Sequence, residues 1–331
     1  MNILLGMIFV LSTIFANTTN TTKKQNDSLN SIYENIILKN SKKSIVDIKR
    51  LQNHILANET NKAKEEFVNL VKSWKSVQAF YILGDLDDNY LDTPRYIDIF
   101  HEGNEDIKKQ LDLILTTDED LKIAHFKNSQ KTINALEYML FTKDLKTKRV
   151  KDIVLRIINK LTLNLQDIYD GYVENKAKFL KDEIASNAIM LNSLIENSYK
   201  IKEWRVGDPS GLSRKFRGKK DNRNAEYYIS KNSIVAVRSI LNTHLMVLGS
   251  QRYKNFGDMI KSYKVKKELN DAVKYINNSL ENTKLIINDD FENTKNTKPL
   301  YKSLKKLHMT YYISLIGKLK ITAKILDADS D

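Results

Sequence analysis

The chain has 331 residues, a formal net charge of +13 and hydrophobic side chains at 41% of its positions. It contains no Cys, which excludes disulfide bonds, thiolate metal sites and a lipid-modified cysteine. The positive charge would attract anionic partners, but the sequence has no long basic run and no nucleic-acid motif, so nucleic acid is not expected as a partner.

The N-terminus is an apolar segment. Residues 1–16 read MNILLGMIFVLSTIFA and precede the polar residues 17–28, which are rich in Thr, Asn and Lys. This order predicts a signal peptide over residues 1–16, a disordered leader over residues 17–28, and a periplasmic or secreted protein. No Lys or Arg precedes the apolar segment. An uncleaved membrane anchor is therefore the alternative, and only in that case do we expect contact with a membrane.

Helical periodicity continues through most of the remaining chain. Only 10 Gly and 3 Pro are present, which is typical of an all-α protein with few tight turns. The long predicted helix over residues 149–180 would let the chain form two helical bundles, one on each side of it. The apolar spacing predicts helices over residues 29–56 (one helix, or two with a break near Asn40), 62–82, 105–115, 128–141, 149–180, 184–204, 224–249, 265–287 and 298–326.

Two segments interrupt the helical pattern. Residues 84–103, GDLDDNYLDTPRYIDIFHEG, form a long connection rich in carboxylates, and such connections are often functional. The Asp spacing does not fit an EF-hand loop, and the residues from His101 onward are a very poor match to a zinc-peptidase signature. Residues 206–224 are rich in Gly, Lys and Arg. This second segment is either a basic surface loop or a rim that attracts an anion.

Polar side chains on the predicted helices are candidate site residues. In the helix over residues 128–141, Gln130, Asn134 and Glu137 lie beside the apolar stripe of Ile133, Leu136 and Leu140. A carboxylate at that margin needs a partner, and an ordinary salt bridge would supply one as well as a functional site would. Trp74 falls on the apolar face of its helix, which fits core packing. The helix over residues 224–249 carries Glu226, Ser230, Arg238 and Asn242 among core positions.

These residues together resemble the imelysin family, also called the M75 peptidase-like family. Its hallmark is a helical Gly-x-His-x-x-Glu segment followed by an aromatic residue, and residues 132–138 occupy that pattern. Three further segments resemble family blocks in the same order, so the resemblance spans residues 28–326. They are the Trp74 helix, the Asp-Thr-Pro-Arg-Tyr-Ile-Asp segment that ends at Asp98, and the segment that carries Glu226, Ser230, Arg238 and Asn242.

The resemblance implies an exported all-helical protein made of two four-helix-bundle halves packed around an interface cleft. It places an imelysin-like domain over residues 29–331, with the N-terminal bundle over about residues 29–148 and the C-terminal bundle over about residues 149–328. Some members of the family are linked to iron acquisition, and a metallopeptidase activity gave the family its name.

This chain departs from the hallmark, because Thr132 replaces the motif Gly and Asn134 replaces the motif His. A neutral carboxamide is a poor ligand for zinc or iron and cannot act as a general base near neutral pH. A catalytic metal normally needs about three protein ligands. Iron or zinc would therefore require Glu137, Asp98 and His101 to converge, and the cofactor is otherwise unidentified.

We therefore expect a non-enzymatic protein, associated with iron uptake, that binds a small ligand, a metal complex or a periplasmic protein partner in the cleft. The alternatives are a metallopeptidase of the M75 type and a basic helical module that binds a membrane surface. The expected ligand-binding residues are Asn134, Glu137, Trp74, Arg95, Tyr96, Asp98, Glu226, Ser230, Arg238 and Asn242.

Overall fold

The computed structural model describes residues 27–103 and 105–323, and within them it contains helices and no strand. The predicted all-α fold is confirmed. The predicted signal peptide and residues 17–26 of the predicted leader lie outside the described residues. Asp27 and Ser28, expected in the leader, are already helical. None of the helices in the described part of the chain is long and apolar enough to cross a membrane.

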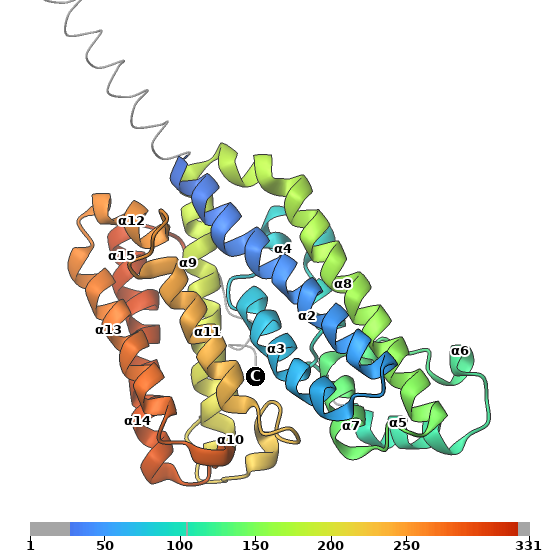
Figure 1. Cartoon of the computed structure of the whole chain (residues 1–331). Helices are drawn as coiled ribbons and strands as arrows, with labels where there is room; N and C mark the ends of the chain where they lie inside the picture. Colours follow the sequence, from blue (N-terminus) through green and yellow to red (C-terminus); the bar gives the residue numbers. More distant parts are fainter. Residues whose placement is uncertain (1–26, 104, 324–331) are drawn as a thin grey trace, which may run out of the picture.

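The first helices form one group, which we call the N-terminal group (Figure 1). In it α2 packs along α3 and α8, and α7 packs on α8. Its members are α2 (Lys39–Leu56), α3 (Thr60–Gln78), α4 (Leu83–Leu86), α5 (Ile107–Thr116), α6 (Leu121–Ala124), α7 (Ile133–Thr142) and α8 (Lys148–Lys181).

The later helices form the C-terminal group, in which α13 packs on α11 and α14, and α14 packs on α9. The two groups meet where α11 packs against α3. Because α8 lies with the N-terminal group, the boundary between the groups falls at Asp182, not near residue 148 as expected. The members are α9 (Glu183–Lys200), α10 (Asp208–Ser210), α11 (Ser233–Leu248), α12 (Phe256–Ile260), α13 (Lys266–Thr283), α14 (Thr294–Met309) and α15 (Ile316–Leu319).

The first predicted helix is continuous, and a π-helical segment, Tyr33–Leu38, leads directly into α2. The predicted break near Asn40 is absent, which leaves the single long helix of the two alternatives. The wider turn places Tyr33 in the core, where its hydroxyl donates a hydrogen bond to the carbonyl of Tyr172. This bond ties the N-terminal helix to α8.

The helix that carries the imelysin-like motif is shorter than predicted. It begins at Ile133, because Thr132 is extended (φ −103°, ψ 170°) and caps it by accepting the Ala135 N–H at 3.4 Å. Gln130 therefore lies in a short 3₁₀ turn before α7, and it does not share a helical face with Glu137 as expected. Its side chain donates to Gln110 Oε1 at 2.9 Å.

The predicted helix over residues 224–249 also starts later, at Ser233. The left-handed conformations of Tyr227 (φ 55°) and Lys231 (φ 54°) interrupt the helix before that point. A residue far away in the sequence fixes the start of α11. Asp289 accepts hydrogen bonds from the N–H groups of Ser233 (2.5 Å) and Ile234 (3.1 Å). Glu226 and Ser230 thus lie in an irregular segment that can reach across to the N-terminal group.

Candidate functional site

Four charged side chains meet in the interior where the two groups join, and we call them the ion cluster: Lys75, Asp98, Arg205 and Glu226. Lys75 comes from α3 and is fully buried (0% exposed). Its ammonium group contacts Asp98 Oδ2 and lies 2.5 Å from Glu226 Oε1, and it donates to Gln78 Oε1 at 2.7 Å. All three ammonium protons therefore have an acceptor.

Arg205 brings the second positive charge from Ile201–Gly207, a π-helical segment that follows α9. Its Nε donates to Glu226 Oε2 at 2.7 Å, and one Nη donates to Gln78 Oε1 at 3.0 Å. The other, Nη1, is buried and has no hydrogen-bond partner among the described residues. The cluster is electrically balanced, and one hydrogen-bond donor remains unused.

The electrostatics of Asp98 fit this arrangement. Burial is the largest single influence and would raise the pKa of its carboxyl group, but the charge of Lys75 and the hydrogen bonds to the carboxylate together outweigh burial. Hydrogen bonds from Lys75, from the Phe100 N–H (3.0 Å) and from the Trp74 indole (3.0 Å) also favour the anion. The pKa of Asp98 is about 2, so it is ionised at every physiological pH.

Glu137 occupies a separate position beside the ion cluster. Its Oε1 accepts hydrogen bonds from the N–H (2.8 Å) and the hydroxyl (2.6 Å) of Ser230, which joins α7 to the C-terminal group. Burial raises the pKa of Glu137 to about 7, although the bonds from Ser230 favour the anion. Both protonation states of Glu137 are therefore accessible near neutral pH.

Tyr227 links Glu137 to the ion cluster. Its ring lies 5.3 Å from the Lys75 ammonium group and packs edge-on against Phe67. Burial raises the pKa of Tyr227 well above its usual value, and the negative charges of Asp98, Glu226 and Glu137 act in the same direction. The buried hydroxyl keeps its proton and has no partner in the described part of the structure.

Asn134, at the position of the motif His, holds the backbone. Its carboxamide oxygen accepts the Ile99 N–H at 2.9 Å, and the neighbouring Ile133 N–H donates to the Ile97 carbonyl at 2.8 Å. These two bonds fix the chain on both sides of Asp98. Asn134 is thus a positioning residue for the ion cluster in this structure.

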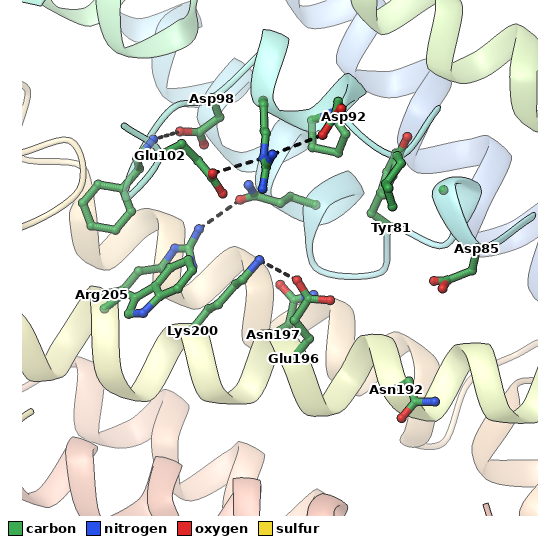
Figure 2. Close-up of a pocket in the computed structure, with 17 residues that line it drawn as sticks. Tyr81, Asp85, Asp92, Asp98, Glu102, Asn192, Glu196, Asn197, Lys200 and Arg205 are labelled. Carbon is green, nitrogen blue, oxygen red and sulfur yellow. Dashed lines mark hydrogen bonds and ion pairs between the residues drawn. The ribbon is translucent and has the colours of Figure 1, made fainter. Parts of the chain in front are cut away.

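A pocket of about 480 Å³ lies between the two groups and borders the ion cluster, since Asp98 and Arg205 belong to its lining. Figure 2 shows its two walls facing one another. One wall comes from α9 and its continuation, and the other from the connection between α3 and α5. The labelled residues of the first wall are Asn192, Glu196, Asn197, Lys200 and Arg205, and those of the second are Tyr81, Asp85, Asp92, Asp98 and Glu102.

Charges around the pocket are paired. Arg95 lies 3.2 Å from Asp92 Oδ1 and 3.1 Å from Glu102 Oε2, and Lys200 lies 2.5 Å from Glu196 Oε1. Lys200 also lies over the ring of Trp204, 5.0 Å from its centre. The pocket therefore offers ion pairs that a charged ligand could join, together with an aromatic surface.

The predicted site residues are divided between these places. Arg95 and Asp98 line the pocket, and Trp74 and Glu226 bond within or beside the ion cluster. Tyr96 is 42% exposed, lies outside the pocket lining, and its carbonyl accepts from Asn164 at 3.0 Å. Arg238 and Asn242 are exposed on α11 and join neither the pocket nor the cluster.

His101 joins a different contact from the one expected. Its Nε2 lies 2.9 Å from Asp208 Oδ2, and its ring stacks on Trp204 with the ring centres 4.7 Å apart. Within residues 27–103 and 105–323, no three His, Asp or Glu side chains are grouped so that they could hold a metal ion. The predicted set of Glu137, Asp98 and His101 is therefore wrong as a set of ligands.

The donor chemistry agrees with that correction. The oxygens of Asp98 and Glu226 already accept hydrogen bonds from buried cations, and the oxygen of Asn134 accepts a backbone N–H. These residues do not fit iron or zinc bound directly by the protein.

Sequence reasoning missed Lys75, Gln78, Arg205 and Trp204. The sequence contained one hint that Lys75 is near the core. It lies four residues after Val71 and three before Gln78, beside the apolar face of α3. A Lys at the edge of an apolar stripe is usually extended into solvent, so the pattern alone would not have identified it.

Comparison with known proteins assigns the family. The family described as Imelysin (Peptidase_M75) matches residues 35–310 of this chain. No curated protein matches it.

A crystal structure of an imelysin-like protein from Psychrobacter arcticum 273-4 has a TM-score of 0.69 at 15% identity and covers 92% of this chain and 98% of its own. A second, from Parabacteroides distasonis ATCC 8503, is provisionally described as an iron-regulated protein A precursor. It has a TM-score of 0.65 at 12% identity and covers 90% of this chain and 94% of its own. The chain therefore belongs to the imelysin family.

Proposed function

We propose that this chain is an exported, non-enzymatic binding protein that holds a small organic ligand, or the iron complex of such a ligand, in the pocket between its two groups. The pocket itself carries the proposal. Its volume of about 480 Å³ is in the range of small-molecule sites, and both groups contribute to its walls. Binding there would change the contact between the groups, which suits a carrier or a sensor.

The lining favours a ligand with hydrogen-bond acceptors and more than one charge. Arg205, Arg95 and Lys200 line the pocket, and Trp204 and Phe100 supply aromatic surface. The ligand rather than the protein would supply the donor atoms for iron, because the side chains around the pocket already bond one another. The relative described as an iron-regulated protein A precursor supports both the link to iron and export. The apolar residues 1–16 also favour export.

The test compares two neighbouring lysines. Lys200 lines the pocket, whereas Lys202 lies outside the lining and pairs with Glu203. Thermal shift and calorimetry would use citrate, ferric citrate, ferric chloride and zinc chloride as probes. We expect citrate or ferric citrate to stabilise the wild-type protein and the Lys202→Ala variant, and to stabilise Lys200→Ala much less. Stabilisation by the metal salts alone, or an equal response of both variants, would overturn the proposal.

A peptidase is the second candidate, and Glu137 is the observation that favours it. A carboxyl group with a pKa of about 7 is suited to general base catalysis near neutral pH. Incubation with unfolded protein substrates, with and without a chelator, would test it. Cleavage that Glu137→Gln abolishes would support a peptidase, and the absence of cleavage would remove it.

A further inference from the structure

The outer side of the last long helix is strongly basic. From residue 294 to residue 326 the sequence contains no Asp or Glu. Lys295, Lys298, Lys302 and Lys305 follow one another at intervals of three or four residues on α14, and all four are exposed. Such spacing places them on one face of the helix. We call this row the lysine stripe.

The lysine stripe lacks the ion pairs seen elsewhere on the surface. Some exposed lysines on other helices pair with a carboxylate one turn away, as Lys43 does with Asp47 and Lys148 with Asp152. No lysine of the stripe has an ion pair within the described residues. Among the described residues, its positive charge is therefore not compensated by an ion pair.

A fixed basic loop adds to the stripe. Arg214, Arg217, Lys219 and Lys220 are exposed, and Lys220 reaches the Thr294 hydroxyl at the start of α14 (3.4 Å). The loop is closed by backbone hydrogen bonds, from the Gly218 N–H to the Gly211 carbonyl (2.8 Å) and from the Asp221 N–H to the Pro209 carbonyl (3.0 Å).

Gly211 allows this closure. Its φ is +68°, and an added Cβ would lie 3.0 Å from the backbone of Lys219. The loop thus holds its cations beside the lysine stripe in a set backbone conformation.

Apolar side chains continue the stripe at its other end. Met309, Tyr312 and Ile313 are 42%, 43% and 56% exposed. They follow Lys305 at helical intervals, through the π-helical segment Thr310–Leu315. Basic side chains are attracted to anionic lipids, and exposed aromatic and apolar side chains beside them can enter the headgroup boundary of a bilayer.

We propose that this face, made of the basic loop, the lysine stripe and the apolar trio Met309, Tyr312 and Ile313, binds the surface of an anionic phospholipid bilayer. The lysines and arginines lie against lipid phosphates, and the apolar trio enters the headgroup region. The apolar trio favours a bilayer over a soluble polyanion, which would leave these side chains in water. The site lies outside the pocket and does not depend on the function proposed for it.

Vesicle flotation of the full chain tests this proposal. The vesicles contain phosphatidylcholine with or without phosphatidylglycerol, so the readout is the gain in binding that the anionic lipid gives. The N-terminal apolar segment would bind both kinds of vesicle alike and cancels in this comparison. We expect a clear gain for the wild-type chain, and we expect it to decrease as salt is raised.

Two double variants with the same change of charge separate a local face from net charge. Lys302→Glu with Lys305→Glu should reduce the gain by at least about tenfold. Lys42→Glu with Lys49→Glu, at exposed positions of α2 in the other group, should leave it nearly unchanged. Equal losses in the two double variants, or no gain for the wild type, would overturn the proposal.

The apolar trio supplies an independent measurement. Tyr312→Ser with Ile313→Ser leaves the charge unchanged and should reduce vesicle binding while leaving binding to a soluble polyanion such as heparin intact. If the wild type binds heparin as tightly as vesicles and this variant binds vesicles normally, the face recognises soluble polyanions and the bilayer proposal is wrong.

Discussion

Lys75 shows how a charged side chain can be kept in the interior of this protein. Its ammonium group has three acceptors, and two of them are carboxylates. The attraction and the hydrogen bonds offset the cost of removing the charge from water only while all partners are present. Arg205 balances the second carboxylate, so each of the four charges of the ion cluster depends on the others.

Replacing Lys75 should therefore be costly. We expect Lys75→Met to lower the free energy of unfolding by about 3–5 kcal/mol, because it leaves two buried carboxylates with one cation. Urea unfolding would measure the change. Lys72→Met, at an exposed position of the same helix, is the control and should have little effect. If both variants lose a similar amount of free energy of unfolding, the ion cluster contributes little to stability.

Glu137 should make stability depend on pH. Burial raises the pKa of Glu137 from 4.5 to about 7 in the folded protein. Between these values the folded state keeps a proton that the unfolded state has lost, so the contribution of Glu137 to stability falls as pH rises through this window. The difference corresponds to roughly 3 kcal/mol. Glu137→Gln, which cannot ionise, should remove this dependence when urea unfolding is followed from about pH 5 to about pH 7.5.

Glu65→Gln, at an exposed position, should retain the wild-type dependence on pH and serves as the control for that experiment. Asp98 acts in the opposite direction at lower pH, since its pKa is lowered to about 2. Its contribution is present above its unfolded pKa of 3.8 and is lost as pH falls toward 2. If the free energy of unfolding depends on pH in the same way in Glu137→Gln and in the wild type, Glu137 is not the source of this dependence.

At the scale of elements, the start of α11 depends on a side chain from the connection between α13 and α14. Asp289 accepts the N–H groups of Ser233 and Ile234 and so acts as a cap supplied by another part of the chain. Asp289 has a left-handed backbone (φ 57°), which Asn also tolerates. Asp289→Asn should therefore keep the backbone, lose one acceptor and the charge, and destabilise the protein by about 1 kcal/mol in thermal unfolding. Asp290→Asn, at the exposed neighbouring position, should be close to neutral.

The helix boundaries show what the sequence could and could not predict. The long helix α8 was predicted nearly to the residue, because its apolar spacing is uninterrupted and its burial is decided by its own sequence. The starts of α7 and α11 were predicted too early. The Asp289 cap lies more than fifty positions from the helix that it starts, and no local pattern contains that information.

The candidate site shows the same limit. The sequence singled out the polar segment around Asp98 and the polar segment around Glu226, and the structure brings Asp98 and Glu226 together in the ion cluster. It did not identify Lys75 or Arg205, because the burial of a basic side chain depends on the carboxylates that fold against it. The predicted metal set failed for a related reason, since His101 turns to Asp208 and away from Glu137.

For the whole molecule, the contacts between the two groups suggest one cooperative unit. The ion cluster takes two charges from each group, and Phe67 packs against both Phe141 of α7 and Tyr227 of the irregular segment before α11. We expect a single unfolding transition in calorimetry, with equal calorimetric and van't Hoff enthalpies. Two separate transitions would show that the groups unfold independently.

The balance of charge in the ion cluster restricts which substitutions its four positions can accept during evolution. Its four members come from four separate segments of the chain, and their charges cancel. A substitution that removes one charge is tolerated only if a second substitution removes an opposite one. In an alignment of imelysin relatives, positions 75, 98, 205 and 226 should therefore covary, with losses of a cation and of a carboxylate occurring in the same sequences.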